Sequence, residues 1–90
     1  MDVREMKKVE RVQTGVRIEK RLLKILKSLA AYQEMSVSDL LEGILLHSLE
    51  GKVPFGPETL AIIETLRTSY GLDLRADDSH SLLEHRTDDA

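Results

Sequence analysis

Two side chains near the N-terminus have the chemistry to pair with nucleic-acid bases. Gln13 carries an amide that can pair with adenine N6 and N7, and Arg17 carries a planar guanidinium that fits guanine O6 and N7. With Gly15 between them, they share one side of a stretch that alternates in polarity from Val12 to Ile18. From the residue types alone, the simpler interpretation is a pair of solvent-facing strand residues.

Other kinds of chemistry have little support. The chain has no cysteine, which excludes disulfides, thiolate metal sites and a cysteine nucleophile. His80 and His85 lie five residues apart, whereas helical metal-binding pairs favour spacings of three or four, so we expect no metal site and no cofactor. Serine, histidine and aspartate cluster in a polar tail that cannot hold a catalytic geometry. We therefore predict that the chain is not an enzyme.

The charge is distributed unevenly over the 90 residues. Residues 1–30 hold nine Lys/Arg against four acidic residues, a net charge of +5, whereas residues 31–90 hold four against twelve, a net charge of −8. This pattern indicates a polyanion contacted from one side, although an ordinary solvated charge gradient accounts for it equally well. No apolar run is long enough to span a membrane and no signal-peptide core follows the N-terminus, so we expect a cytoplasmic protein without membrane contact.

The alternating stretch and two helical patterns predict the elements that would hold these residues. Alternation over residues 12–18 predicts a half-buried β-strand. Apolar residues at helical spacing predict helices over residues 19–33 and 36–49, the second capped by Ser36 and ending before Gly51. A single strand leaves its backbone polar groups unpaired, so the same strand of a second copy is the economical partner.

The C-terminal half predicts one more helix. Gly56 and Pro57 begin it, Tyr70 ends it, and Gly71 is expected to adopt the left-handed conformation with Leu72 folding back onto the last turn. We divide the chain into a flexible arm (1–8), a strand–helix–helix domain (9–50), a connector with the third helix (51–76) and a partly disordered acidic tail (77–90). Residues 79–85 could form one or two helical turns.

The order strand, helix, turn, helix over residues 12–49 resembles the ribbon-helix-helix family (Arc/MetJ/CopG-like). The matching stretches are TGVRIE (14–19), RLLKILKSLAAY (21–32) and MSVSDLLEGILLHSL (35–49). The resemblance implies a mostly α fold class, ribbon-helix-helix, with a third C-terminal helix added. In that fold one N-terminal strand from each chain of a homodimer pairs into an antiparallel ribbon over the core helices.

The resemblance also implies a function and the residues that carry it. It implies a sequence-specific transcriptional regulator, a repressor in the simplest case, that inserts the ribbon into the major groove of double-stranded DNA. The implied base-contacting positions are Gln13, Gly15 and Arg17, although Gly15 stands where the family carries a polar side chain. The implied phosphate-binding residues are Ser36, Val37, Ser38, Arg11, Lys20 and Arg21. The implied dimer core is Val16, Ile18, Leu22, Leu26, Leu29, Leu40, Leu41, Ile44 and Leu45.

Two alternatives stay open. The chain could be the antitoxin of a toxin–antitoxin pair, in which the third helix and the acidic tail wrap a toxin. It could also be a dimeric protein-interaction module that has lost DNA binding, which Gly15 and the acidic majority favour.

Overall fold

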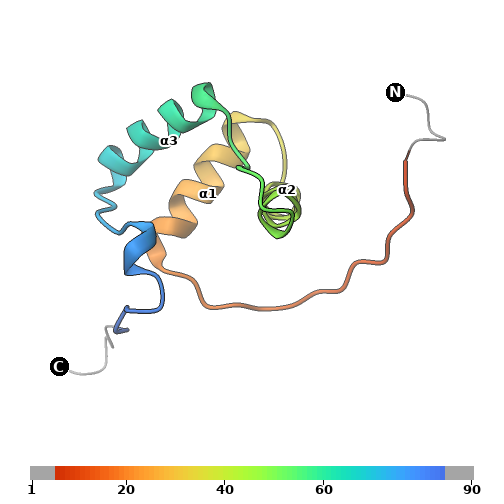
Figure 1. The fold of residues 1–90 in the computed structure, drawn as a ribbon, viewed down its shortest axis with the longest axis horizontal. Helices are drawn as coiled ribbons and strands as arrows, with labels where there is room; N and C mark the ends of the chain where they lie inside the picture. Colours follow the sequence, from red (N-terminus) through yellow and green to blue (C-terminus); the bar gives the residue numbers. More distant parts are fainter. Residues whose placement is uncertain (1–5, 85–90) are drawn as a thin grey trace.

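The computed structural model describes residues 6–84, which are mostly helical (Figure 1). Three α-helices follow one another: α1 (Lys20–Tyr32), α2 (Val37–Leu49) and α3 (Pro57–Tyr70). A short 3₁₀ turn, η2 (Ala76–Asp78), comes after them. α1 packs against both α2 and α3, so it is the central helix of the domain. No helix in this part of the chain is both long and apolar enough to cross a membrane.

The core lies where α1 meets the other two helices. Leu29 of α1 is only 1% exposed and forms a buried cluster with Ala30 and with Leu40 of α2. Partly buried apolar side chains surround this cluster from all three helices and the connector: Leu26, Val37, Ile44, Phe55, Ile62, Ile63 and Leu66. These side chains give a single chain a small core of its own. Burial of one such side chain contributes roughly 1.5–3 kcal/mol to the free energy of folding.

The helix ends confirm the predicted capping residues. The Ser36 hydroxyl accepts a hydrogen bond from the Asp39 N–H at 3.0 Å and caps α2. Gly71 has φ +65° after α3, and the Leu72 N–H donates to the Arg67 carbonyl at 2.9 Å. Leu72 is buried, as expected for a residue that folds back onto the last turn. Local capping chemistry therefore sets the limits of α2 and α3.

The predicted β-strand over residues 12–18 is wrong. The part of the chain that the structure describes contains no strand, so the ribbon-helix-helix fold class is contradicted, while the mostly α character is confirmed. The physical reason is that no other segment of residues 6–84 forms backbone hydrogen bonds with these residues to build a ladder. Both sides of the alternation face solvent, and Val12 and Val16 are each 79% exposed.

The C-terminal turn also differs from the expected one. The structure places a 3₁₀ turn at residues 76–78, where the Asp78 carboxylate accepts a hydrogen bond from the Arg75 N–H at 2.7 Å. Residues 79–84 contain no helix: the Ser81 N–H donates to the Asp78 carbonyl in a turn, and His80 has a positive φ of 67°, which a right-handed helix does not allow. Residues 1–5 of the predicted arm and residues 85–90 of the predicted tail lie outside the described residues.

Replacement of Leu29 by alanine tests the position of the core. We expect Leu29→Ala to lower the free energy of unfolding by about 2–5 kcal/mol, because it removes the most deeply buried side chain. The measurement is urea denaturation followed by circular dichroism. Leu83→Ala is the matched control: this side chain is 98% exposed, and its loss should change the free energy by no more than about 0.5 kcal/mol. Equal urea midpoints for the two variants would contradict this core.

Candidate nucleic-acid interface

Residues 6–19, the N-terminal segment, form an elongated stretch that leaves the helices and leads directly into α1 (Figure 1). Its side chains are exposed up to Ile18, including the predicted base-contacting residues Gln13 and Arg17. The space around Gly15 is open, because an added Cβ would meet no atom within 4 Å. The three predicted base-contacting positions therefore lie on one accessible stretch of chain.

Two arginines of the N-terminal segment are held by carboxylates from distant parts of the chain. Arg11 donates through Nε and Nη2 to the two carboxylate oxygens of Glu42 on α2, at 2.7 and 2.9 Å. These hydrogen bonds lower the pKa of Glu42 and raise the pKa of Arg11. Arg17 forms an ion pair with Glu84. The predicted phosphate-contacting and base-contacting arginines thus each have an acidic partner that no local sequence signal identifies.

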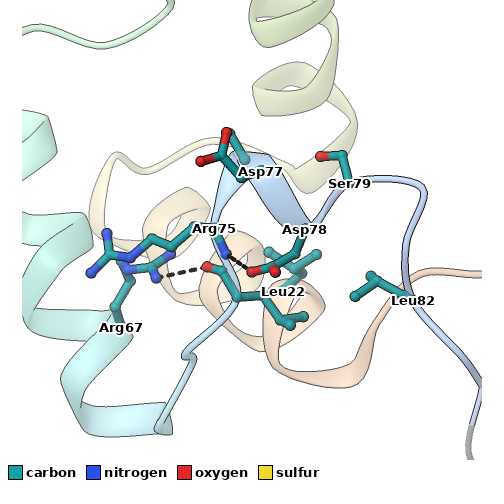
Figure 2. Close-up of a pocket in the computed structure, with 9 residues that line it drawn as sticks. Leu22, Arg67, Arg75, Asp77, Asp78, Ser79 and Leu82 are labelled. Carbon is teal, nitrogen blue, oxygen red and sulfur yellow. Dashed lines mark hydrogen bonds between the residues drawn. The ribbon is translucent and has the colours of Figure 1, made fainter.

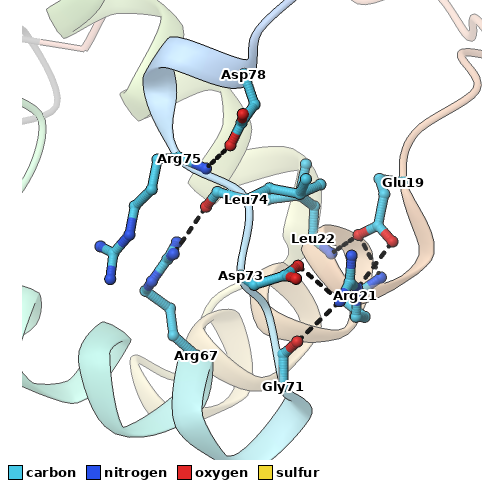
Figure 3. A network of polar contacts seen from close by, with 9 residues as sticks. All are labelled: Glu19, Arg21, Leu22, Arg67, Gly71, Asp73, Leu74, Arg75 and Asp78. Carbon is cyan, nitrogen blue, oxygen red and sulfur yellow. Dashed lines mark hydrogen bonds and ion pairs between the residues drawn. The ribbon is translucent and has the colours of Figure 1, made fainter. Parts of the chain in front are cut away.

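Arg21, another predicted phosphate-binding residue, is the centre of a polar network between the start of α1 and the end of α3 (Figure 3). Its guanidinium donates to the Glu19 carboxylate at 3.0 Å, to the Gly71 carbonyl at 2.8 Å and to the Asp73 carboxylate at 3.1 Å. The hydrogen bond to Glu19 is the main reason that the pKa of Arg21 is raised. This guanidinium therefore fastens the two helix ends together.

Glu19 in the same network caps α1. Its carboxylate accepts hydrogen bonds from the backbone N–H groups of Arg21 at 2.8 Å and Leu22 at 3.1 Å (Figure 3). Partial burial acts to raise the pKa of Glu19, but these hydrogen bonds and the Arg21 guanidinium outweigh it, so the pKa is lowered. Sequence analysis did not identify this cap, because glutamate is not among the preferred capping residues.

The start of α2 carries the predicted phosphate-binding residues Ser36, Val37 and Ser38. Ser36 and Ser38 are exposed, and Val37 is half-buried against the core. The first backbone N–H groups of a helix lack partners within the helix, and the positive end of the dipole favours an anion there. Asp39 lies in this first turn and adds a negative charge close to the same site.

Three lysines on α1 form an exposed group of positive charges. Lys20, a predicted phosphate-binding residue, lies on the same exposed side of α1 as Lys24 and Lys27. None of these three forms an ion pair with another described residue. The Lys24 ammonium lies 5.9 Å from the ring centroid of Tyr70, whose hydroxyl is 2.8 Å from that of Ser28.

The predicted dimer-core residues divide into two groups. Five are buried or half-buried within the chain: Leu26, Leu29, Leu40, Leu41 and Ile44. Four are exposed: Val16, Ile18, Leu22 and Leu45. Leu45 is one of four exposed apolar residues close in sequence at and after the end of α2, with Leu46, Leu49 and Val53, and we call these four residues the α2 patch. The third helix was predicted, and the structure adds that it packs on α1 of the same chain.

A shallow hollow of about 670 Å³ lies beside the end of α3 and is lined partly by η2 (Figure 2). Arg67 crosses one side of it and donates to the Leu74 carbonyl at 2.7 Å (Figures 2 and 3). The lining contains two arginines and two aspartates beside leucine side chains, so its charges balance. This balance favours neither an anionic nor a cationic ligand.

The described residues bring together no group of three metal-ligating side chains. His47, on the flank of α2, has Nδ1 2.7 Å from the Gly43 carbonyl. Comparisons with models of protein families, with curated proteins and with solved structures found no match to this chain. The chemistry of the N-terminal segment and its surroundings is therefore the basis on which a function can be inferred.

The cap at Glu19 predicts a pH-dependent contribution to stability. We expect Glu19→Ala to lower the free energy of unfolding at pH 7 by about 0.5–2 kcal/mol. Because the pKa of Glu19 is lower in the folded than in the unfolded chain, this contribution is complete above the unfolded pKa of about 4.3 and is lost as pH falls through the folded value.

Urea denaturation of both proteins at pH 7 and at about pH 3 measures the difference, which should shrink at the lower pH. Glu10→Ala is the matched control, because Glu10 lies exposed in the N-terminal segment and should change stability little at either pH. A difference that is as large at low pH as at pH 7 would contradict a role for the ionised carboxylate.

Proposed function

We propose that this protein is a DNA-binding transcriptional regulator, acting in the cytoplasm as a repressor, and that its N-terminal segment enters a groove of duplex DNA. The observation that carries the proposal is the exposure of Gln13 and Arg17 on a basic, elongated stretch that leads directly into α1. The major groove of B-DNA, ~12 Å wide, has room for an elongated chain and displays the base edges that amide and guanidinium groups recognise.

The surroundings of the segment supply contacts for the DNA backbone. Lys7, Lys8 and Lys20 are exposed and form no ion pair with another described residue. The backbone N–H groups at the start of α2 add a site suited to a phosphate. Such contacts position the protein, whereas Gln13 and Arg17 would supply the sequence preference. With Gly15 between them, each chain offers two base-contacting side chains rather than three.

The regulator would act as a homodimer through the α2 patch. Leu49 is 83% exposed, and Leu45 and Leu46, one helical turn before it, and Val53 in the connector are exposed as well. Apolar side chains gathered in this way on a small domain mark a contact with another protein. A second copy would cover the patch symmetrically and present two N-terminal segments to DNA.

The alternative from a different class is an interaction module without DNA binding. It is favoured by the acidic partners of the segment, because Arg11 is held by Glu42 and Arg17 by Glu84. The antitoxin alternative has less support, since α3 packs on α1 and Leu72 is buried within the chain. These surfaces are therefore not left open for a toxin.

DNA binding can be tested by fluorescence anisotropy with labelled random-sequence and genomic duplexes. We expect binding that weakens steeply from about 50 to 200 mM salt, because lysine contacts with phosphates release counterions. Arg17→Ala should reduce discrimination between sequences by about 1–3 kcal/mol if its guanidinium pairs with a guanine.

Arg75→Ala is the matched control, since it removes the same charge from an exposed arginine next to η2. Binding that is independent of salt and equal for both variants would rule out this function and favour the interaction module.

The dimer is tested by analytical ultracentrifugation over a range of protein concentrations. We expect a dimer for the unmodified chain and a shift towards monomer for Leu49→Asp, because a charge cannot be buried unpaired in an apolar interface. Leu83→Asp places the same charge at another highly exposed leucine outside the patch and should leave the dimer unchanged. A monomer at all concentrations would contradict the assembly without contradicting DNA binding.

A further inference from the structure

Arg11 and Glu42 form an interaction that joins the N-terminal segment to α2 across 31 residues of sequence. Both hydrogen bonds are within normal length, at 2.7 and 2.9 Å, and both carboxylate oxygens are used. The guanidinium fork of Arg11 is thereby occupied in the geometry that it would otherwise use for a phosphate. Asp39, one helical turn before Glu42, adds to the negative field around Arg11.

This geometry sets Glu42 in competition with the DNA backbone. A phosphate can accept from Arg11 only after the carboxylate has been displaced, and Glu42 then repels that phosphate. We propose that Glu42 withholds Arg11 from DNA, so that the chain carries a built-in carboxylate competitor for its own phosphate-binding arginine. The proposal rests on the proposed DNA-binding function and adds to it an internal limit on affinity.

Several observations favour competition over simple stabilisation of the fold. The pair is exposed on both sides, and an exposed ion pair contributes little to folding. Arg17 forms an ion pair with Glu84 through one guanidinium nitrogen, so both arginines of the described N-terminal segment have acidic partners. By contrast, Lys7 and Lys8 of the same segment form no ion pair with another described residue. Acids therefore face the two side chains best suited to bidentate recognition.

A double-mutant cycle on the full chain distinguishes competition between Glu42 and phosphate for Arg11 from simple repulsion of DNA by the Glu42 charge. Affinity for a random-sequence duplex is measured against salt for the unmodified chain, Glu42→Gln, Arg11→Ala and the double variant. We expect Glu42→Gln to bind roughly two- to fivefold tighter. Its plot of log affinity against log salt should be steeper by about 0.9 per chain, the slope of one added phosphate contact. Arg11→Ala should bind no more tightly than the unmodified chain, because Glu42 then lacks its neutralising partner, and the double variant should lose the added slope.

Glu58→Gln is the control for net charge. Glu58 lies exposed in the first turn of α3 and forms no ion pair with another described residue. Its replacement changes the charge by the same amount and should leave the salt slope unaltered. If Glu42→Gln behaves like Glu58→Gln, or tightens binding equally with and without Arg11, the competition is overturned.

Two further results make failure of this proposal distinguishable from failure of the function. Salt-dependent binding that responds to Arg17→Ala but not to Glu42→Gln would overturn the competition alone, whereas no binding by any variant would overturn both. A carboxyl-detected NMR titration of Glu42 checks the pair directly. Its pKa should be lower than usual in the free protein and return towards the ordinary value in Arg11→Ala; an ordinary pKa in the unmodified chain would overturn the pair and with it the proposal.

Discussion

The burial of α1 from two sides is the constraint on which the rest of the structure depends. A helix of 13 residues is marginal by itself in water, so α1 needs packing to persist. α2 covers it around Leu40, and α3 covers it with Ile62, Ile63 and Leu66. Because α3 packs on this side of α1, the three helices of one chain share a small core. The surface that is left over then decides what the molecule can bind.

On that surface some positive side chains are paired with carboxylates and others are not. Exposed lysines lie on α1 and on the N-terminal segment, while the arginines of the segment lie against carboxylates of α2 and of the C-terminal residues. Lysine contributes long-range attraction to a polyanion, whereas arginine contributes directional pairing. The lysines are thus available for long-range attraction, whereas the guanidinium groups of the segment are already paired with carboxylates.

Local signals explain which parts of the structure the sequence predicts well. The caps at Ser36 and Gly71 depend on residues within one turn, and both were predictable. The alternation at Val12 and Val16 is also a local pattern, but a strand needs a partner that local pattern cannot supply, and here both valines stay exposed. The acids that meet Arg11 and Arg17 lie 31 and 67 residues away, which periodicity and capping rules do not reach. The exposure of Gln13 and Arg17 was therefore predictable, whereas the acids beside Arg11 and Arg17 were not.

The contact of Arg21 with Gly71 and Asp73 bears on the order in which the domain assembles. α1 and α2 are joined by a short turn, whereas the Arg21–Gly71 hydrogen bond closes a loop of 50 residues. Short-range pairs form with a smaller loss of chain entropy, so the α1–α2 hairpin can form before α3 docks. The N-terminal segment joins α1 beside Arg21, and the hydrogen bonds of Arg21 to Gly71 and Asp73 form there only when α3 has docked. The direction in which the segment leaves the domain is thus a property of the completed fold.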